Sequence, residues 1–255
     1  MNYNIIIPAR LKSTRLPNKM LRELHGKPLI EWSWRAAMKS TAQKVLVATD
    51  DVQIFDHLTA LGADVIMTLD SHETGTDRLS EVSQKLQFSD HEIIVNWQGD
   101  EPFLPLSFID KVVTALHENK AVSMSTLATP IQDWEEVHDP NAVKVVLNES
   151  DEALYFSRAA IPYQRGEMKL SGKISGQSPY LRHIGLYAYR AAFLNEYPHL
   201  TPSPLEEMEK LEQLRALANN RKIAVAISTE TPPPGIDTAE DLQKAQAWIA
   251  KQTHS

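Results

Sequence analysis

The sequence predicts an α/β fold with a mainly parallel, mixed sheet, helices on both faces and a smaller embedded subdomain. Short apolar, β-branched runs alternate with amphipathic stretches through the first half of the chain, and consecutive strand-like runs follow after residue 128. Apolar and charged residues make up 42% and 23% of the 255 residues, as is ordinary for a globular protein. We therefore expect a single domain, 1–255, with the subdomain at about residues 130–200.

The first half reads as regular alternation of strand and helix. Strands are predicted at 4–7, 44–49, 63–68 and 92–96, and helices at 28–40, 51–61, 76–86 and 106–119. Pro8 is expected to end the first strand, because proline donates no ladder hydrogen bond. Either Asp50 or Asp51 is expected to cap the second helix.

The second half loses this rhythm. Strands are predicted at 122–128, 143–147, 153–157, 183–189 and 223–227, and helices after 189 to about 197, at 205–219 and at 238–251. The strands 143–147 and 153–157 follow one another closely and should be antiparallel. Gly166–Ser178 is rich in glycine, serine and lysine, which indicates a mobile loop.

Positive charge is concentrated directly after the first strand. The first forty residues carry eight Lys and Arg against two Glu, although the whole chain has a net charge of −7. Four of these cations follow the strand with no acid between them: Arg10, Lys12, Arg15 and Lys19. Open α/β sheets bind ligands at the carboxyl ends of their strands, so this loop predicts a local polyanion site. A solvated loop is the alternative, and a general affinity for nucleic acid is disfavoured by the net charge.

Several common chemistries are excluded or disfavoured. The chain has no cysteine, hence no disulfide, thiolate nucleophile or cysteine zinc site, and no His spacing supports zinc. Neither G-x-x-x-x-G-K-[ST] nor G-x-G-x-x-G occurs, and no glycine precedes Gly26, which disfavours a P-loop kinase or a dehydrogenase. No apolar run approaches the ~20 residues of a membrane span, and no signal peptide is apparent, so we expect a soluble, cytoplasmic protein.

Acidic residues at two positions are candidates for binding a metal ion. Asp100 and Glu101 follow the fourth strand, and Asp237 has a similar setting before the last helix. Mg²⁺ prefers carboxylate oxygens and usually takes one or two of them together with substrate phosphates. The alternatives are a turn residue at Asp100 and a helix N-cap at Asp237, supported by Glu240.

The segment from Glu73 to Arg78 supplies hydroxyls, including that of Thr76, a permissive glycine and a helix N-terminus. Such a segment binds a nucleotide base or ribose in some proteins and is a plain capped loop in others.

Glu212 lies at an unusual position in the predicted helix 205–219. It shares one helical stripe with Leu205, Met208 and Ala216, which would bury it. The candidate partners in the neighbouring subdomain are Arg158, Arg165, Arg182 and His183. The residues leave open a structural ion pair and an acceptor for a sugar hydroxyl.

Taken together, the motifs resemble one known family. NIIIPARLKSTRLPNK, HETGTDR, NWQGDEP, DPNAVKVV, LYFSRAAIP, LRHIGLYAYR, SPLEEMEKLEQLRAL and PGIDTAEDL occur in the order typical of 3-deoxy-manno-octulosonate cytidylyltransferases, also called CMP-Kdo synthetases. The resemblance spans essentially the whole chain, and LEQLR with RHIGLYAYR is its most specific part. It implies a Rossmann-like nucleotidyltransferase domain, with the subdomain used for sugar binding and homodimerisation. It also implies that CTP and Kdo give CMP-Kdo and pyrophosphate with Mg²⁺, for lipopolysaccharide assembly.

The resemblance also implies roles for individual residues. Arg10, Arg15, Lys19 and Asp100 would be catalytic. Around the nucleotide it places Ala9, Arg10, Arg15, Lys19, Arg78 and Gln98. Asp100 and Asp237 would hold the metal. The sugar pocket would be lined by Arg158, Arg165, His183, Tyr187, Glu212 and Gln213.

Two positions depart from the family pattern: Asn18 replaces the commoner glycine of the RLPGK loop, and Trp97 replaces a smaller aliphatic residue. Neither change removes a functional group. Without a thiol or an evident Ser–His pair, we expect no covalent intermediate, and the residues identify no general base. Alternatives are a cytidylyltransferase for sialic acid or an amino-Kdo, a non-catalytic nucleotide-binding module and, least of all, a nucleic-acid binder.

Overall fold

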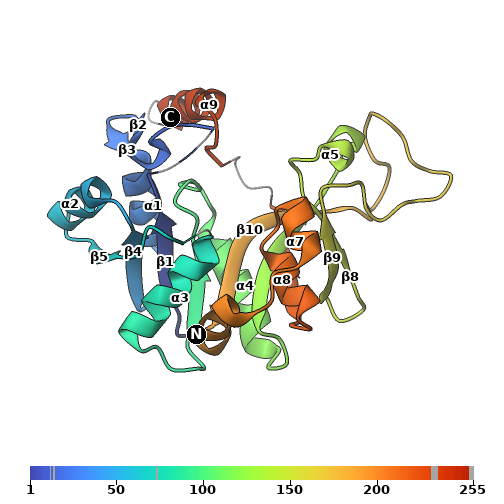
Figure 1. Ribbon diagram of the computed structural model, residues 1–255. Helices are drawn as coiled ribbons and strands as arrows, with labels where there is room; N and C mark the ends of the chain where they lie inside the picture. Colours follow the sequence, from blue (N-terminus) through green and yellow to red (C-terminus); the bar gives the residue numbers. More distant parts are fainter. Residues whose placement is uncertain (12, 14, 73, 231–234, 253–255) are drawn as a thin grey trace. The chain divides into compact units, whose positions relative to one another are not determined.

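The computed structural model describes residues 1–252 except residues 12, 14, 73 and 231–234, and its chain falls into two compact units (Figure 1). The N-terminal unit consists of Asn2–Leu106 and the C-terminal segment from residue 232 onward. The middle unit consists of Ser107–Thr231 together with Met1, and residues 130–200 lie within it.

The N-terminal unit is built around a parallel sheet. Its strands are β1 (Asn4–Ala9), β4 (Lys44–Thr49), β5 (Asp64–Met67) and β6 (Ile93–Asn96), in the order β6-β1-β4-β5. The accompanying elements are α1 (Leu29–Ala37), α2 (Val52–Ala60), α3 (Gly75–Leu86), α9 (Ala239–Gln252), the 3-10 helix η1 (Lys19–Leu21) and the hairpin β2 (Glu23–Leu24) and β3 (Lys27–Pro28). The predicted alternation of strand and helix is therefore confirmed, and Asp51 caps α2 by accepting from Gln53 N at 2.9 Å.

The prediction that Pro8 ends the first strand is wrong. β1 continues through Pro8, which is in register with Ala48 of β4, to Ala9. The carbonyl of Ile6 accepts from Trp97 N on the β6 side at 3.2 Å. Backbone groups two residues apart in a strand point to the same side, so the backbone nitrogen of Pro8 also faces β6. Because β6 has already ended at Asn96, this strand needs no N–H from Pro8.

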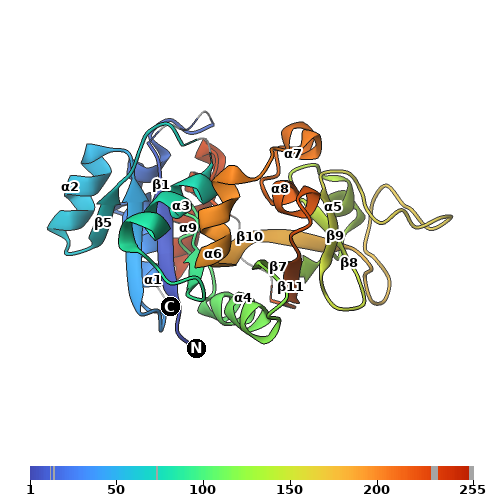
Figure 2. The same cartoon turned by 60° about the horizontal axis from the view of Figure 1, so that its bottom comes forward.

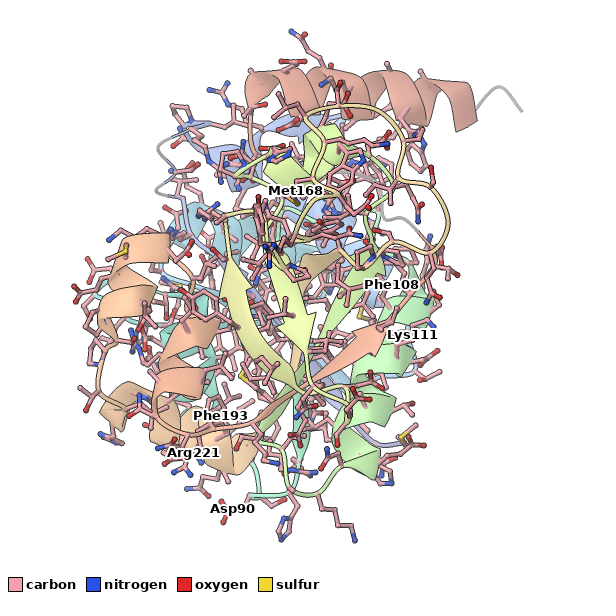
Figure 3. All side chains as sticks on the ribbon, turned by 90° about the vertical axis from the view of Figure 1, so that its right-hand side faces the viewer. Asp90, Phe108, Lys111, Met168, Phe193 and Arg221 are labelled. Atoms are coloured by element: carbon pink, nitrogen blue, oxygen red, sulfur yellow. The ribbon has the colours of Figure 1, made fainter. Side chains whose placement is uncertain are left out.

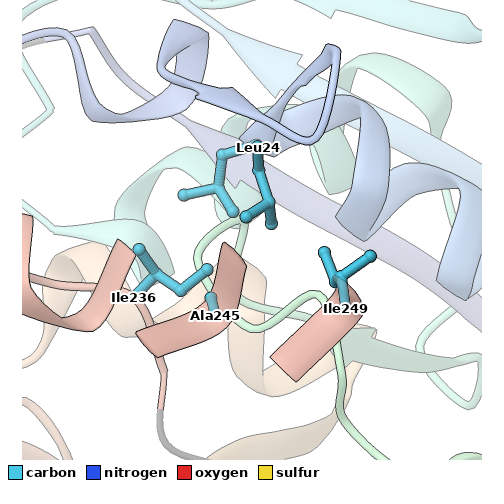
Figure 4. Packing of buried hydrophobic residues seen from close by; sticks show 5 residues of the cluster. Leu24, Ile236, Ala245 and Ile249 are labelled. Carbon is cyan, nitrogen blue, oxygen red and sulfur yellow. The ribbon is translucent and has the colours of Figure 1, made fainter. Parts of the chain in front are cut away.

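An apolar cluster joins the C-terminal helix to the β2–β3 hairpin (Figure 4). Its buried members are Leu24, Leu29, Ile236, Ala245 and Ile249. Phe103 adds a ring contact with Trp248, their centroids lying 4.6 Å apart. Since Ile236 is fully buried here, its neighbour Asp237 is fixed within the N-terminal unit.

The middle unit carries a mixed sheet. Its strands are β7 (Met124–Pro130), β8 (Lys144–Leu147), β9 (Ala153–Ser157), β10 (Leu181–Arg190) and β11 (Ile223–Ile227). β11 runs parallel to β7, β10 runs antiparallel to β7, and β8 is antiparallel to both β10 and β9, as predicted for that last pair. The helical elements are α4 (Leu106–Glu118), α5 (Trp134–His138), α6 (Ala191–Glu196), the 3-10 helix η2 (Tyr197–His199), α7 (Pro204–Glu209) and α8 (Gln213–Ala218). On α4, Lys111 donates to the carbonyl at the end of β11 at 3.5 Å (Figure 3).

The predicted single helix 205–219 is interrupted. α7 ends before Lys210, which adopts the left-handed conformation with φ of 54°, and α8 begins at Gln213 (Figure 2). The supposed buried stripe does not form, because Leu205 and Met208 are 44% and 79% exposed. The break instead buries Leu211 and Leu214, which are 7% and 1% exposed.

The segment Gly166–Ser178 contains no helix or named strand, as expected for a loop. Met168 (Figure 3) and Ile174 nevertheless pack on a buried cluster of Ile131, Trp134, Val137 and Tyr180. The carbonyl of Gly172 accepts from Trp134 N at 2.9 Å. Main-chain and apolar contacts therefore tie this loop to α5.

Glu81 on α3 fastens the loop that follows β5, and this arrangement predicts an acid-sensitive stability. Burial alone would raise the pKa of Glu81, but hydrogen bonds from Lys85, His72 and Leu69 N lower it to about 2. Its contribution to the free energy of unfolding is thus present above the ordinary glutamate pKa and is lost as the pH falls from about 4.5 to about 2.

We expect Glu81→Gln to lower the free energy of unfolding by up to about 3 kcal/mol at pH 7. The two proteins should differ little near pH 2. Urea denaturation of both proteins across this pH range checks it, and a difference that is constant with pH would contradict the assignment.

Candidate functional site

A lysine and two aspartates form the centre of the candidate site, all in the N-terminal unit. Lys19 begins η1 after the β1 loop, Asp100 follows β6, and Asp237 precedes α9. Lys19 Nζ donates to Asp237 Oδ1 at 2.8 Å and also to Asp100 Oδ2. Two carboxylates distant in sequence therefore converge on one cationic atom at the carboxyl ends of β1 and β6.

The charge of this cluster is well balanced. Burial alone would lower the pKa of Lys19, but the charge and hydrogen bond of Asp100, and then those of Asp237, raise it above its ordinary value. Arg15 adds a second ion pair to Asp237, with Nη2 and Oδ1 3.1 Å apart. The Lys19 side chain is 10% exposed and that of Arg15 is 64% exposed. Lys19 is thus the anchored cation of the loop, and Arg15 is an accessible one.

The other predicted residues of this loop are partly described. Ala9 is buried at the end of β1, and Arg10 is exposed directly after it. Lys12, which we counted among the four cations, lies outside the described residues.

Two glycines allow the segments of the cluster to approach one another. A Cβ on Gly99 would lie 3.0 Å from Met20 Sδ and 3.1 Å from the Pro8 carbonyl oxygen, tighter than most real Cβ contacts. The Gly99 carbonyl also accepts from Ser33 Oγ of α1 at 2.7 Å. A Cβ on Gly235 would meet a carboxylate oxygen of Glu101 at 2.8 Å. These supporting residues were not among the predicted ones, although a glycine directly before Asp100 was a signal for close approach.

The last helix is capped by residues other than Asp237. Thr238 Oγ1 accepts from Asp241 N at 3.2 Å, and Asp241 Oδ2 accepts from Thr238 N at 2.9 Å. The Asp237 side chain is left to contact Lys19 and Arg15. The alternative of an N-cap role for Asp237 is therefore wrong.

Asn18, the departure from the family's glycine, lies in the left-handed region with φ of 57° and ψ of 33°. Asparagine is among the few residues that adopt this conformation readily, so the loop keeps a backbone that glycine would also adopt.

We expect Asn18→Gly to change the free energy of unfolding by less than about 0.5 kcal/mol, and Asn18→Val to lower it by about 1–2 kcal/mol. Valine branches at Cβ and is strained at this φ. Urea denaturation measures both variants, and equal stability of the two would contradict the assigned backbone.

Arg78 and its neighbours have structural partners. The Arg78 guanidinium pairs with Asp50 Oδ2 at 2.9 Å, contacts Thr68 Oγ1, and is 3% exposed. Thr76 is buried in the first turn of α3, and Gln98 is half-buried after β6. A part for Thr76, Arg78 and Gln98 in nucleotide binding stays a prediction.

Trp97 fits its position without disturbing the loop. Its side chain is fully buried, and its Nε1 donates to the Glu101 carbonyl at 3.0 Å. The larger residue therefore supports the turn that carries Asp100.

The middle unit holds the residues for which the resemblance implies sugar binding. His183 and Tyr187 belong to a row of neighbouring rings formed by Phe156, His183, Tyr187, Tyr189, Phe193 and Tyr197. Burial, with a smaller effect of Arg182, lowers the pKa of His183 to about 3, so this ring is neutral near pH 7. Its Nε2 lies 2.9 Å from Thr126 Oγ1. Burial raises the pKa of Tyr187, because it disfavours the charged form there as well.

Arg158 is held by α7 and by a buried lysine. Its Nε donates to the Glu209 carbonyl at 2.7 Å, and its backbone N donates to the Glu209 carboxylate at 3.0 Å. Lys144 is fully buried and donates to the carbonyls of Asp139, Ala142 and Arg158 at 2.8, 2.5 and 2.8 Å. Burial lowers the pKa of Lys144. This supporting role of Lys144 was not predicted, and the only signal for it in the sequence was its place within DPNAVKVV.

The remaining predicted sugar-binding residues differ in exposure. Arg165 is exposed in the loop before Gly166, and Glu212 is half-buried at the start of α8. Gln213 is 5% exposed, and its Nε2 has no hydrogen-bond partner within the part of the chain that the structure describes. A buried amide donor without a partner is costly unless a ligand meets it.

Two kinds of feature are absent from the described residues. They contain no group of three or more His, Asp or Glu side chains that could hold a metal ion unaided. They also include no helix with the length and apolar character needed to cross a membrane.

The fold and the cluster at the strand ends define a class of protein, and comparison with known proteins identifies it. The family model described as "Cytidylyltransferase" matches residues 4–223, so this is a cytidylyltransferase. Curated relatives from Photobacterium profundum and Aliivibrio fischeri are each 48% identical over 98% of this chain and 100% of their own length. A relative from Francisella tularensis subsp. novicida is 47% identical over 96% of this chain and 97% of its own.

All three relatives are named 3-deoxy-manno-octulosonate cytidylyltransferase. The chain belongs to the 3-deoxy-manno-octulosonate cytidylyltransferase family. A solved structure described as CMP:2-keto-3-deoxy-manno-octonic acid synthetase complexed with CTP is 38% identical, with a TM-score of 0.88 over 98% of this chain and 99% of that one.

Proposed function

We propose that this chain transfers the cytidylyl group of CTP to 3-deoxy-manno-octulosonate, forming CMP-Kdo and releasing pyrophosphate. The observation that carries the proposal is the convergence of Asp100 and Asp237 on Lys19 beside a basic loop. This is a place for an anion and a cation together, as a metal–triphosphate complex requires. The names of the relatives and the CTP in the solved relative support the choice of substrates.

The donor set fits Mg²⁺, which we propose as the cofactor. Asp100 and Asp237 direct carboxylate oxygens to one point, and their side chains are 25% and 38% exposed. Mg²⁺ typically takes one or two carboxylates and completes its shell with water and substrate phosphates, so two aspartates suffice. When bound, the ion would neutralise part of the charge on the triphosphate.

The cations of the loop have the complementary role of binding the phosphates. The sugar carboxylate and the α-phosphate are both anionic, and two like charges at ~4 Å cost about 4 kcal/mol at an effective dielectric near 20. Uncompensated, this repulsion would slow the reaction about a thousandfold. Arg10, Arg15 and Lys19 lower that cost and align the α-phosphate for attack by the anomeric hydroxyl of the sugar. No covalent enzyme intermediate is needed.

The middle unit is proposed to bind the sugar acid. Arg158 and Arg165 would pair with its carboxylate, whereas His183, Tyr187, Glu212 and Gln213 would bind its hydroxyls. The Gln213 amide donor, which has no partner among the described residues, and the neutral ring of His183 support this assignment, since both suit hydroxyl recognition better than charge pairing.

The wider setting is also proposed by family likeness. It includes the role of residues 130–200 as a sugar-binding and dimerisation subdomain within one nucleotidyltransferase domain. It further includes a homodimer, a cytoplasmic location and supply of CMP-Kdo for lipopolysaccharide assembly.

The test is pyrophosphate release from purified protein. We expect release only when CTP, Kdo and Mg²⁺ are all present, and omission of any one should reduce it to background. Sialic acid and an amino-Kdo, offered in competition, determine sugar preference. CTP binding without release in the complete mixture would instead indicate a non-catalytic nucleotide-binding module.

A further inference from the structure

The helix break before Gln213 is held in place by specific contacts. Lys210, a non-glycine residue, adopts a φ of 54°, and its N–H donates to the Glu206 carbonyl at 2.8 Å. Leu211 N also donates to that carbonyl, at 3.4 Å. A lysine in the left-handed region is unfavourable by itself, so surrounding contacts must stabilise this backbone.

An ion pair spans the break. Glu206 of α7 and Arg215 of α8 form a two-point pair, with Nε–Oε2 at 2.8 Å and Nη2–Oε1 at 2.7 Å. Their side chains are only 10% and 13% exposed. Glu206 also completes the capping box of α7 with Ser203. Because a planar two-point pair fixes orientation as well as distance, Arg215 ties the start of α8 to the first turn of α7.

Tyr197 supports the break from a second direction. The Arg215 guanidinium lies over the Tyr197 ring, 4.7 Å from its centroid. The Tyr197 hydroxyl donates to the Glu212 carbonyl at 3.3 Å. Tyr197 is 2% exposed and ends the ring row that contains His183 and Tyr187. The segment that precedes Gln213 is therefore packed against the same row that contributes the proposed sugar-binding rings.

We propose that Arg215, held by Glu206 and Tyr197, is a positioning residue that sets the Gln213 amide to donate to an oxygen of the sugar acid. The inference rests on the proposed function of this chain. It is carried by the juxtaposition of a stabilised helix break with a buried amide nitrogen that lacks a partner among the described residues. Gln213 is the first residue of α8, directly after the break, so the contacts that hold the break also fix the backbone that carries its amide.

The experiment compares two conservative substitutions. Arg215→Lys keeps the charge but removes the two-point geometry. Arg221→Lys is the matched control, because Arg221 pairs with Glu196 in the same unit and both of those side chains are more exposed, at 40% and 38%. We expect Arg215→Lys to raise the KM for Kdo at least tenfold, with the KM for CTP within twofold of wild type. Arg221→Lys should change neither constant by more than twofold.

Further variants separate positioning from folding. Glu206→Gln should raise the KM for Kdo as Arg215→Lys does. The double variant, which combines both substitutions, should have no higher a KM than either single variant, because all three lose the same ion pair. Tyr197→Phe, which keeps the ring but loses the hydroxyl, should raise the same KM by a smaller factor. If Arg215→Lys fails to fold, Glu206→Gln and Tyr197→Phe decide the proposal.

The outcomes are distinct. A lower melting temperature with an unchanged KM for Kdo would overturn positioning and leave Arg215 structural. Equal rises in both KM values would also overturn it. Absence of pyrophosphate release by the wild-type protein would instead refute the proposed function.

Discussion

Asp100→Asn is expected to lower the turnover of CTP and Kdo by a factor of about 100–1,000, with the fold unchanged. Asparagine keeps the shape but removes one of the two carboxylates that converge on Lys19. Removing one preorganised electrostatic group from an active site, such as a single oxyanion-hole donor, typically costs about 2.7–4 kcal/mol of transition-state stabilisation. Initial rates of pyrophosphate release at saturating CTP and varied Mg²⁺ measure the loss.

The fold should tolerate Asp100→Asn because Asp100 lies in the loop after β6 and is held there through its backbone. Its carbonyl accepts from Ile236 N at 3.0 Å, and this bond does not involve the side chain. Asp90→Asn is the matched control, because Asp90 is an exposed aspartate that precedes the same strand, at its amino end (Figure 3). Asp90→Asn should retain the wild-type rate. A wild-type rate in Asp100→Asn would show that the proposed metal site is wrong.

The sequence predicted the strands of the N-terminal unit well because their signals are local. β1, β4 and β6 consist largely of buried aliphatic residues, and Asp51 caps α2 with its own side chain. Pro8 was misjudged for a different reason: whether a proline disrupts a strand depends on how far the neighbouring strand extends. That extent is set by pairing and is not visible in a local pattern.

The helix at 205–219 shows the same limit in the middle unit. Its apolar spacing suits a continuous helix, but the ion pair between Glu206 and Arg215 and the burial of Leu211 stabilise a broken one. Likewise, the partners of Arg78 and Arg158 are Asp50 and Glu209, each far away in sequence. Periodicity identifies charged residues on a buried face but does not select their partners.

For the candidate site, the rule that ligands bind at strand carboxyl ends anticipated a cluster of Lys19 and Asp100. Asp237 was a candidate because its setting resembles that of Asp100, but its local sequence left a helix cap as an alternative, which only the contacts of the folded chain exclude. The supporting contacts of Gly99, Ser33 and Lys144 could not be predicted, because each depends on segments that meet only in the folded chain.

Lys19→Met should distinguish the role of the Lys19 ammonium from that of a metal ion bound by the same two carboxylates. The Lys19 ammonium lies between the two carboxylates, where it competes with any other cation for their oxygens. Removing it should therefore tighten binding of Mn²⁺, used as a probe for Mg²⁺, about tenfold, which corresponds to about 1.4 kcal/mol. This value is well below the Coulomb estimate at close range, since Asp100 and Asp237 are partly exposed and solvent screens them.

The same substitution should lower turnover, even though it tightens metal binding. Lys19 is the most buried cation of the described part of the loop, and its raised pKa keeps it charged for binding phosphate. We expect turnover to fall about a hundredfold, although Mn²⁺ binds more tightly.

In EDTA the variant should have a lower melting temperature than wild type, because two carboxylates lose their shared cation, and Mn²⁺ should restore it. Isothermal titration, pyrophosphate release and thermal denaturation give the three values. Lys39→Met, an exposed lysine just beyond α1, should alter none of them. Weaker Mn²⁺ binding in Lys19→Met would contradict competition at a shared site and would place the ion away from Asp100 and Asp237.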